Sequence, residues 1–224
     1  MYEFVNDAEI RPYRLYCSKI LTNLRSLLME KYEINTQFIL VGSGAKNMVM
    51  RDGSGPFDLD YNLVIINMPN MFWENLDKLK NTIISTLNKI VGQTCFSDGH
   101  DSTSVITSYL HSNTTCEVIF KFDIAILGKN NLGNLCRLVH NKKNKQYTWN
   151  EVPYSKNVKD KANTIKTLGF WDIVRSKYKE LKNHYLRHHD ENHPSFVVYV
   201  ETVNQIYEII QKGGINNGKK SRCV

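Results

Sequence analysis

The stretch Phe57-Asp58-Leu59-Asp60-Tyr61-Asn62-Leu63 alternates apolar residues with acidic or polar ones. Successive side chains of a β-strand point to opposite faces of a sheet, so Asp58 and Asp60 lie on one face and the apolar residues on the other. Two carboxylates about 7 Å apart on one strand face repel each other unless a cation lies between them. The pattern therefore predicts a strand over residues 57–66, whose polar face carries either a cation site or two solvated acids.

A later strand carries a third carboxylate, Asp123. The strand is predicted over residues 117–127, with an apolar face formed by Val118, Phe120, Phe122, Ile124 and Ile126. Asp123 therefore lies on the opposite face with Glu117 and Lys121, for which an ion pair within the sheet is as good an explanation as a catalytic role. If the two strands are neighbours, Asp123 joins Asp58 and Asp60 in an oxygen-ligand cluster suited to hard cations such as Mg²⁺.

A glycine-rich turn precedes the two acids. A short predicted strand ends at Gly42-Ser43-Gly44, and a brief helix is predicted over residues 45–50. Backbone N–H groups and the helix dipole at such a turn favour a phosphate group, to which the Ser43 hydroxyl adds a donor. Lys46 lies where its side chain can reach the same phosphate. On its own the turn is a weak signal, and it matches neither the P-loop nor the dinucleotide-binding spacing.

The remaining pattern predicts an α+β protein. Amphipathic helices are predicted over residues 12–31 and 70–91, further strands over 37–41 and 104–110, and closing helices over 165–188 and 195–212. The short connection after residue 110 indicates an antiparallel pair with the strand that carries Asp123. Residues 130–163 are polar and without a clear period, which predicts a long connection. The fold class is therefore a mixed β-sheet with helices, followed by a C-terminal helical subdomain.

The charge is unevenly divided along the chain. The 224 residues have a formal net charge of +7. Residues 1–128 contain 11 Lys and Arg against 14 Asp and Glu, a net of −3, whereas residues 129–224 contain 18 against 8, a net of +10. An acidic part joined to a strongly basic part indicates a polyanionic partner, with metal ions as one means of binding it.

Cysteine usage and hydropathy predict a cytoplasmic protein. The five cysteines are an odd number, widely scattered and without a C-x-x-C pair, which argues against a disulfide framework and a structural zinc site. No apolar run approaches the roughly 20 residues that span a bilayer. The first ten residues carry acids where a signal peptide would carry bases. We therefore expect reduced thiols and no membrane partner.

The ordered combination of motifs resembles the DNA polymerase β-type nucleotidyltransferase superfamily, in particular its stand-alone minimal members. The matching features are the Gly42-Ser43 turn, the Asp58-Leu59-Asp60 strand and Asp123 on a later strand. The resemblance implies transfer of a nucleoside monophosphate from a nucleoside triphosphate, such as ATP, to a hydroxyl acceptor, with release of pyrophosphate. It also implies that residues 1–128 are the catalytic domain and that residues 129–224 are a basic connection with the helical subdomain.

The resemblance also assigns roles to the residues. Asp58 and Asp60 would bind two Mg²⁺ ions, for which Mn²⁺ is an alternative. Asp123 would complete the metal nearer the acceptor and act as its base. Gly42 and Ser43 would hold the β- and γ-phosphates.

A basic helix face in the second half of the chain is a further candidate for phosphate contact. Arg175, Lys179 and Lys182 are spaced i, i+4 and i+7 on a predicted helix, so they share one face. Arg175 and Lys182 are the predicted nucleotide-binding residues of this face. A solvated basic face explains the same spacing equally well.

The acceptor is left open by the sequence. A small molecule, a second nucleotide, an RNA end and a protein side chain all provide the hydroxyl that the implied chemistry needs. One alternative function is non-catalytic binding of nucleotides or nucleic acid by the same fold. Another is a toxin or defence component that modifies RNA or protein.

Overall fold

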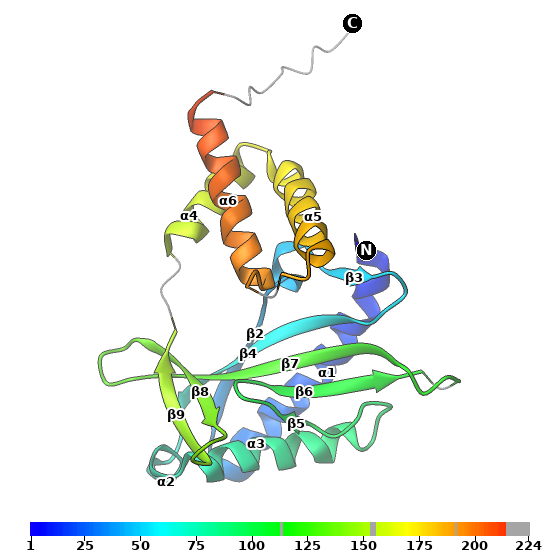
Figure 1. Cartoon of the computed structure of the whole chain (residues 1–224). Helices are drawn as coiled ribbons and strands as arrows, with labels where there is room; N and C mark the ends of the chain where they lie inside the picture. The colour runs from blue at the N-terminus through cyan, green and yellow to red at the C-terminus, as the bar shows by residue number, and fades with distance from the viewer. Residues whose placement is uncertain (113, 153–155, 191, 214–224) are drawn as a thin grey trace, which may run out of the picture. The chain divides into compact units, whose positions relative to one another are not determined.

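The structure, a computed structural model, describes residues 1–112, 114–152, 156–190 and 192–213 (Figure 1). The chain divides into two compact units, one formed by Glu3–Pro153 and the other by Met1–Tyr2 with Tyr154–Val224. The sequence places its domain boundary after residue 128, which is earlier than this spatial division. The roles assigned to the two domains stay predictions.

The larger unit is built on a seven-stranded mixed sheet. Its strand order is β2-β4-β7-β6-β5, with β8 paired to β7 and β9 paired to β8. The strands are β2 (Asn35–Val41), β4 (Phe57–Asn67), β5 (His100–Asp101), β6 (Ile106–His111), β7 (Val118–Lys129), β8 (Leu135–Asn141) and β9 (Gln146–Glu151). A separate two-stranded sheet pairs β1 (Tyr2–Phe4) with β3 (Met50–Asp52).

The central pair of the sheet, β4 and β7, is parallel, whereas β2 and β6 run antiparallel to it on either side. The predicted antiparallel pairing of β6 with β7 is therefore confirmed. The last residues of β7, Leu127 to Lys129, pair with β8 instead of β6. Strand β7 thus pairs along one edge with β6 and then with β8. The α+β class predicted from the sequence is confirmed.

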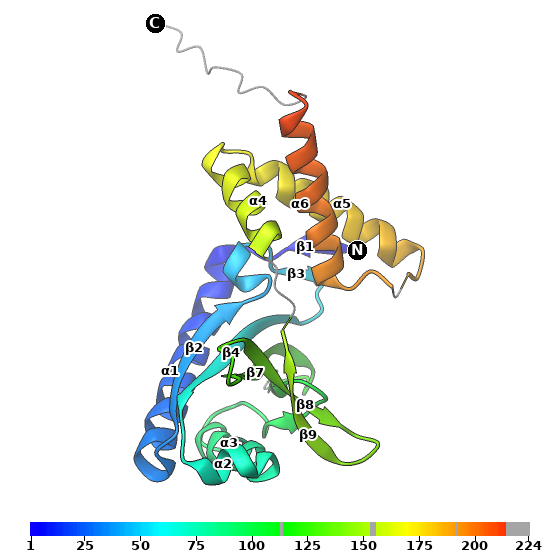
Figure 2. The same cartoon turned by 90° about the vertical axis from the view of Figure 1, so that its left-hand side faces the viewer.

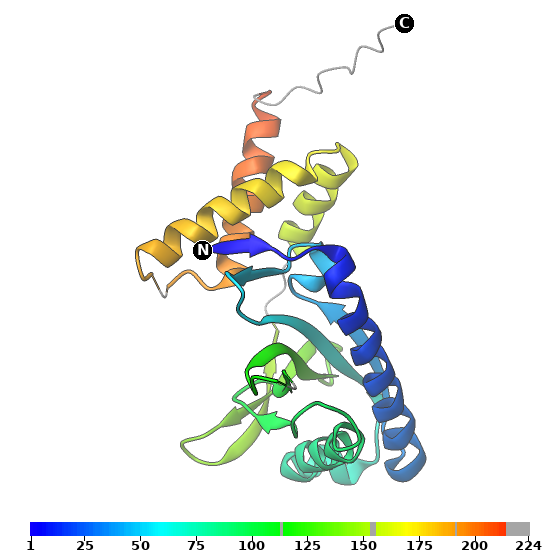
Figure 3. The ribbon, with the colours of Figure 1, turned by 90° about the vertical axis from the view of Figure 1, so that its right-hand side faces the viewer.

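The hydrophobic core covers one face of this sheet. Helices α1 (Asp7–Tyr32) and α3 (Leu76–Val91) pack against each other and against that face (Figures 2 and 3). The buried side chains from the two central strands include Phe57, Leu59, Tyr61, Leu63, Ile65, Phe120, Phe122, Ile124 and Ile126. The alternation read from the sequence is thus confirmed, and it leaves the acids on the opposite face.

The helix predicted over residues 70–91 is two helices, α2 (Asn70–Glu74) and α3. Asn75 separates them, with an extended backbone and a side-chain oxygen that accepts a hydrogen bond from the Lys78 amide at 2.8 Å. An asparagine in this position satisfies one of the free N–H groups at the start of α3. The continuous apolar spacing hides this break, because the period continues across it.

The prediction that residues 130–163 form a long connection is wrong. This segment contains β8, β9 and part of α4 (Lys156–Thr167). Only alternate residues of β8, Cys136 and Leu138, are buried. The hairpin gives a weak apolar signal because most of its other side chains face solvent, which explains why the sequence pattern fails there.

A buried ion pair fixes this hairpin to α3. The Lys80 side chain is almost fully buried, and its Nζ lies 3.0 Å from Asp101 Oδ1. The Tyr147 hydroxyl donates a hydrogen bond to the same carboxylate, and His140 Nδ1 lies 3.2 Å from it. Removing one partner of a buried pair leaves an uncompensated charge, so this cluster holds α3, β5, β8 and β9 in a defined arrangement.

The smaller unit consists chiefly of α4, α5 (Trp171–Arg187) and α6 (Ser195–Gln211). The single helix predicted over residues 165–188 is divided between α4 and α5. Gly169, with φ +78°, lies at the break. A left-handed backbone at this position ends a helix and is readily adopted by glycine. The closing helix is confirmed as α6.

Helix length and cysteine state bear on the remaining sequence predictions. In the described ranges, every helix is too short or too polar to cross a bilayer. The four cysteines in those ranges are free thiols, with Cys17 and Cys136 buried and Cys95 and Cys116 exposed. Cys223 lies outside the described residues.

Candidate active site

Strand pairing brings the three predicted aspartates together. In the parallel pair of β4 and β7, Asp60 lies opposite Asp123, and Asp58 lies opposite Lys121. One carboxylate oxygen from each of Asp58, Asp60 and Asp123 lies within 4.8 Å of the others. Within the part of the chain that the structure describes, these residues form the one cluster of three potential metal-ligating side chains. They are hereafter called the Asp triad.

The Asp triad carries poorly compensated negative charge. Burial, followed by repulsion from Asp58 and Asp123, raises the pKa of Asp60 to about 6. Burial also raises the pKa of Asp123, an effect that repulsion from Asp58 reinforces. Three oxygen ligands held together against their own repulsion are the donor set that hard divalent cations prefer. The residues present therefore fit a divalent metal site.

Lys121 supplies a positive charge beside the Asp triad. Its Nζ lies 3.6 Å from Asp58 Oδ2. Burial lowers the pKa of Lys121, but the charges of Asp58 and Asp123 outweigh this effect, so its pKa is raised. Lys121 therefore forms the ion pair within the sheet, and its partner is Asp58. Glu117 is exposed just before β7.

The sequence gives no indication of Thr107, which contacts the Asp triad directly. Thr107 is buried on β6 opposite Asp123, and its hydroxyl donates a hydrogen bond to Asp123 Oδ1. This bond lowers the pKa of Asp123 and fixes one of its two oxygens. A threonine in a strand is common, so only the register between β6 and β7 identifies it.

If the Asp triad catalyses the nucleotidyl transfer that the sequence resemblance implies, replacing Thr107 by Val is expected to reduce turnover about 10- to 100-fold, the usual effect of losing a partner of a metal ligand. Valine preserves the shape but leaves Asp123 Oδ1 without its donor, so the carboxylate loses its fixed orientation. Thr107→Ser keeps the hydroxyl and is expected to retain most activity. Steady-state rates of pyrophosphate release over a metal titration test this. Equal rates for the Val variant and the natural protein would contradict the role of Thr107.

The glycine turn lies directly against the Asp triad. Val41 at the end of β2 pairs with Asp60, and Gly42 follows with φ +61°. A Cβ atom on Gly42 would lie 2.1 Å from Asp60 Oδ2. Glycine is required here for its left-handed backbone and because the Asp60 carboxylate occupies the space of a side chain.

The brief helix predicted after this turn is a single 3₁₀ turn, η1 (Gly44–Lys46). Asn47, with a left-handed backbone, ends it, and β3 begins at Met50. One turn has little helix dipole, so backbone and hydroxyl donors are the groups left to hold a phosphate. Ser43 lies at the start of η1, next to Gly42.

Lys46 contacts the turn that precedes it. Its Nζ donates a hydrogen bond to the Gly42 carbonyl at 2.9 Å. Its charge also lowers the pKa of Asp60, although burial and the neighbouring acids have the larger effect. Lys46 therefore stabilises the turn beside the Asp triad. Its contact with phosphate stays a prediction.

The two predicted nucleotide-binding residues of the basic helix lie in the helical unit, on α5. Arg175 Nη1 lies 3.7 Å from Asp172 Oδ1. Lys182 Nζ donates a hydrogen bond to Ser195 Oγ at 2.8 Å and lies over the Tyr2 ring. These contacts all fall within the helical unit. A role of Arg175 and Lys182 in nucleotide binding stays a prediction.

The raised pKa of Asp60 makes the stability of the metal-free protein depend on pH. A carboxyl whose pKa is raised by folding stabilises the fold below its unfolded pKa, and this contribution is lost as pH rises through about 6. We expect a loss on the order of 2 kcal/mol between about pH 4 and pH 7, at 1.36 kcal/mol per pKa unit with a discount for solvent. Asp60→Asn is expected to remove most of it. Denaturant unfolding in EDTA at both pH values measures the effect.

Added metal provides the complementary result. At pH 7, Mg²⁺ or Mn²⁺ at 100 times its Kd is expected to stabilise the natural protein by about 2.7 kcal/mol. Asp60→Asn is expected to weaken this stabilisation. Equal stabilisation of both proteins would show that the ions bind elsewhere.

Comparisons with known proteins show the same fold. No protein-family model matches the chain, and no curated protein matches it. The structure of Escherichia coli MS115-1 CdnC with ATP is 14% identical, with a TM-score of 0.55 over 93% of this chain and 61% of CdnC. The Vibrio cholerae DncV cyclic AMP-GMP synthase, in complex with the linear intermediate 5′ pppA(3′,5′)pG, is 11% identical. Its TM-score is 0.65 over 91% of this chain and 68% of DncV.

This chain spans 61% of CdnC, so CdnC is substantially longer than the segment that matches it. At 11–14% identity the likeness concerns the fold. The chain therefore shares the nucleotidyltransferase-like α+β fold of CdnC and DncV.

Proposed function

We propose that the protein is a metal-dependent nucleotidyltransferase, which moves a nucleoside monophosphate from a nucleoside triphosphate to a hydroxyl acceptor and releases pyrophosphate. The observation that carries this proposal is the Asp triad, with its carboxylate oxygens within 4.8 Å of one another. Its position beside a glycine turn matches the arrangement that this chemistry needs, a cation site next to a phosphate site.

Asp58 and Asp60 on β4 would hold Mg²⁺ or Mn²⁺, with Asp123 on β7 completing the site nearer the acceptor. Bound divalent cations neutralise the charge of a triphosphate and lower the pKa of an acceptor hydroxyl. Asp123 is the base in this proposal, because its carboxylate would lie nearest the acceptor hydroxyl. The Thr107 hydroxyl fixes Asp123 Oδ1 while the proton is transferred.

The glycine turn would hold the β- and γ-phosphates. Gly42 presents its backbone without a side chain immediately beside Asp60, which allows a phosphate to approach both the turn and the cation site. The Ser43 hydroxyl adds a donor at the same end of η1. Lys46, hydrogen-bonded to the Gly42 carbonyl, keeps a positive charge next to this phosphate site.

We further propose that the acceptor is the hydroxyl of a second nucleotide. DncV, with which this chain shares its fold, is described as a cyclic AMP-GMP synthase and was solved with a linear dinucleotide intermediate. A nucleotide acceptor fits the excess of basic residues in the second half of the chain, since the acceptor then carries a triphosphate of its own.

Incubation with single and paired α-labelled nucleoside triphosphates, in Mg²⁺ or in Mn²⁺, tests both the nucleotidyl transfer and the nucleotide acceptor. Nucleotidyl transfer releases pyrophosphate, and label in a phosphodiester survives treatment with phosphatase. We expect phosphatase-resistant label and pyrophosphate in equal amounts, both abolished by EDTA.

The outcomes separate the alternatives. Pyrophosphate release only after RNA or a protein is added would overturn the nucleotide acceptor but retain the transferase. Triphosphate binding without pyrophosphate under any of these conditions would indicate a non-catalytic nucleotide-binding protein and contradict the proposal.

A further inference from the structure

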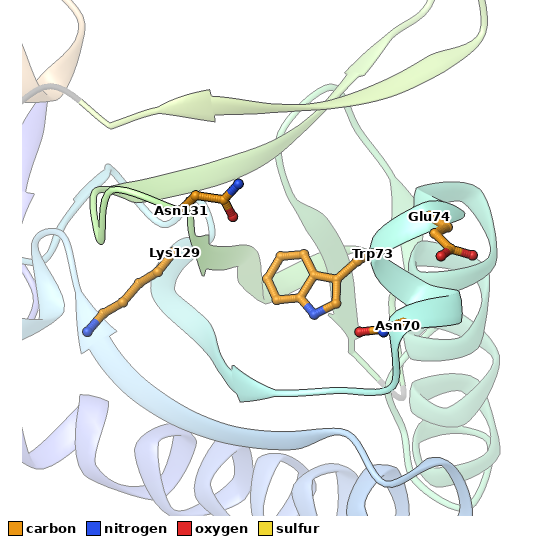
Figure 4. Close-up of a pocket in the computed structure, with 5 residues that line it drawn as sticks. All are labelled: Asn70, Trp73, Glu74, Lys129 and Asn131. Carbon is orange, nitrogen blue, oxygen red and sulfur yellow. The ribbon is translucent and has the colours of Figure 1, made fainter.

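A pocket of about 420 Å³ lies away from the Asp triad in the larger unit (Figure 4). It is lined by Asn70, Trp73, Glu74, Lys129 and Asn131. Lys129 is the last residue of β7, and the distance along this strand from Asp123 is roughly 20 Å at about 3.3 Å per residue. The pocket is therefore a separate feature of the sheet and not an extension of the Asp triad.

The indole of Trp73 is held in place inside this pocket while 36% of the residue is exposed. Its ring centroid lies 5.8 Å from that of Trp149 on β9. The tips of both rings lie close to Gly128, where a Cβ atom would lie 3.1 Å from Trp149 Cη2 and 3.3 Å from Trp73 Cη2. Trp73 thus packs against Trp149 and next to Gly128, and its exposed surface is available to stack on a planar ligand.

The turn that carries Asn131 is also held in place. The Asn130 side chain accepts hydrogen bonds from the Leu132 and Asn134 amides at 3.0 and 2.9 Å. The side-chain amides of Asn130 and Asn134 both donate to Glu151 Oε1 on β9. This network fixes the turn between β7 and β8, so the polar groups of the pocket are arranged in advance of any ligand.

Opposite charges flank the tryptophan. Figure 4 shows Lys129 and Asn131 on one side of Trp73, and Asn70 and Glu74 on the other. A ligand with a planar ring, an amino group at one end and an anionic group at the other would match this order. Glu74 would accept from the amino group and Trp73 would stack on the ring, while the flexible Lys129 side chain would turn toward the anion.

We propose that this pocket is a second nucleotide-binding site, which takes an adenine nucleotide. Asparagine side chains pair with the amino edge of adenine, whereas guanine is most often read by Arg or Lys. The base stacks on Trp73 with its exocyclic amino group toward Asn70 and Glu74, and its phosphate lies toward Lys129. The site is independent of the chemistry at the Asp triad and requires no metal ion.

Calorimetric titration of the full chain with AMP in EDTA tests the site, because EDTA removes the metal on which nucleotide binding at the Asp triad depends. We expect saturable binding of one AMP. Inosine monophosphate, which lacks the exocyclic amino group, and adenosine, which lacks the phosphate, are each expected to bind at least about fivefold more weakly.

Three variants assign the binding to the pocket. Trp73→Ala is expected to weaken AMP binding at least tenfold, since stacking of one base contributes about 1–3 kcal/mol. Lys129→Gln, a change at an exposed side chain, is expected to weaken AMP binding but leave adenosine binding unchanged. Asp60→Asn, the matched control at the Asp triad, is expected to bind AMP as the natural protein does.

Failure of this site is distinguishable from failure of the proposed transferase activity. Absence of AMP binding in EDTA would overturn the second site, whatever the activity at the Asp triad. AMP binding unaffected by both Trp73→Ala and Lys129→Gln would also overturn it, because the nucleotide would then lie elsewhere. Equal affinity for AMP and inosine monophosphate would contradict the assignment to adenine.

Discussion

Replacing Asp60 by Asn is expected to lower the rate of pyrophosphate release about a thousandfold or more. The Asp60 carboxylate lies within 4.8 Å of those of Asp58 and Asp123, and the amide of asparagine offers one neutral oxygen in its place. Bound cations supply several kcal/mol of charge stabilisation, and each 1.36 kcal/mol changes the rate tenfold. Asp58→Asn and Asp123→Asn are expected to have effects of the same order. Single-turnover assays of pyrophosphate release at saturating triphosphate measure all three.

Asp98→Asn is the matched control, because Asp98 is an exposed acid of the same unit outside the site. The control is expected to turn over normally. Circular dichroism and thermal unfolding should show all four variants folded, since each change replaces an acid outside the buried core by an amide of the same shape. Full turnover in the three Asp triad variants would contradict the assignment of the active site.

Replacing Gly42 by Ala is expected to give the second large effect, a loss of activity of at least 100-fold. The new Cβ would lie 2.1 Å from Asp60 Oδ2, so either the turn or the carboxylate must move. A displacement of about 1 Å at a reacting site lowers rates on the order of 100-fold. The left-handed backbone adds about 1–2 kcal/mol of strain. Rates and unfolding free energies measure these two contributions separately.

Gly53→Ala separates the effect of the Cβ contact with Asp60 from the effect of left-handed backbone strain. Gly53 has φ +56°, close to the +61° of Gly42, but a Cβ atom there would meet nothing within 4 Å. The Gly53 variant is therefore expected to lose similar backbone stability and to keep its activity. Equal activity in the two variants would show that the close approach of Gly42 to Asp60 has no catalytic importance.

The central strands could be predicted from the sequence because one face of each is strictly apolar. Periodicity identifies β4 and β7 and assigns Asp58, Asp60 and Asp123 to the correct face. It fails where the apolar signal is weak, as in β8 and β9, or where one residue interrupts a continuous period. Asn75 and Gly169 are two such residues, and each ends or begins a helix by a local backbone effect.

The part of the site that could not be predicted from the sequence depends on the register between strands. Nothing in the local pattern indicates that Asp60 lies opposite Asp123 or that Thr107 on β6 faces Asp123. The pocket at Trp73 has the same origin, since Trp73 and Trp149 come from distant segments that the fold brings together next to Gly128. Such contacts depend on pairings between strands that are far apart in the chain.

The most direct test of a metal-dependent active site at the Asp triad is the structure of a crystal soaked with a non-hydrolysable nucleoside triphosphate and Mg²⁺. Our account predicts divalent cations ligated by Asp58, Asp60 and Asp123, with the β- and γ-phosphates on the Gly42-Ser43 turn. A bound triphosphate whose phosphates lie away from that turn, with no cation density between the three carboxylates, would contradict it.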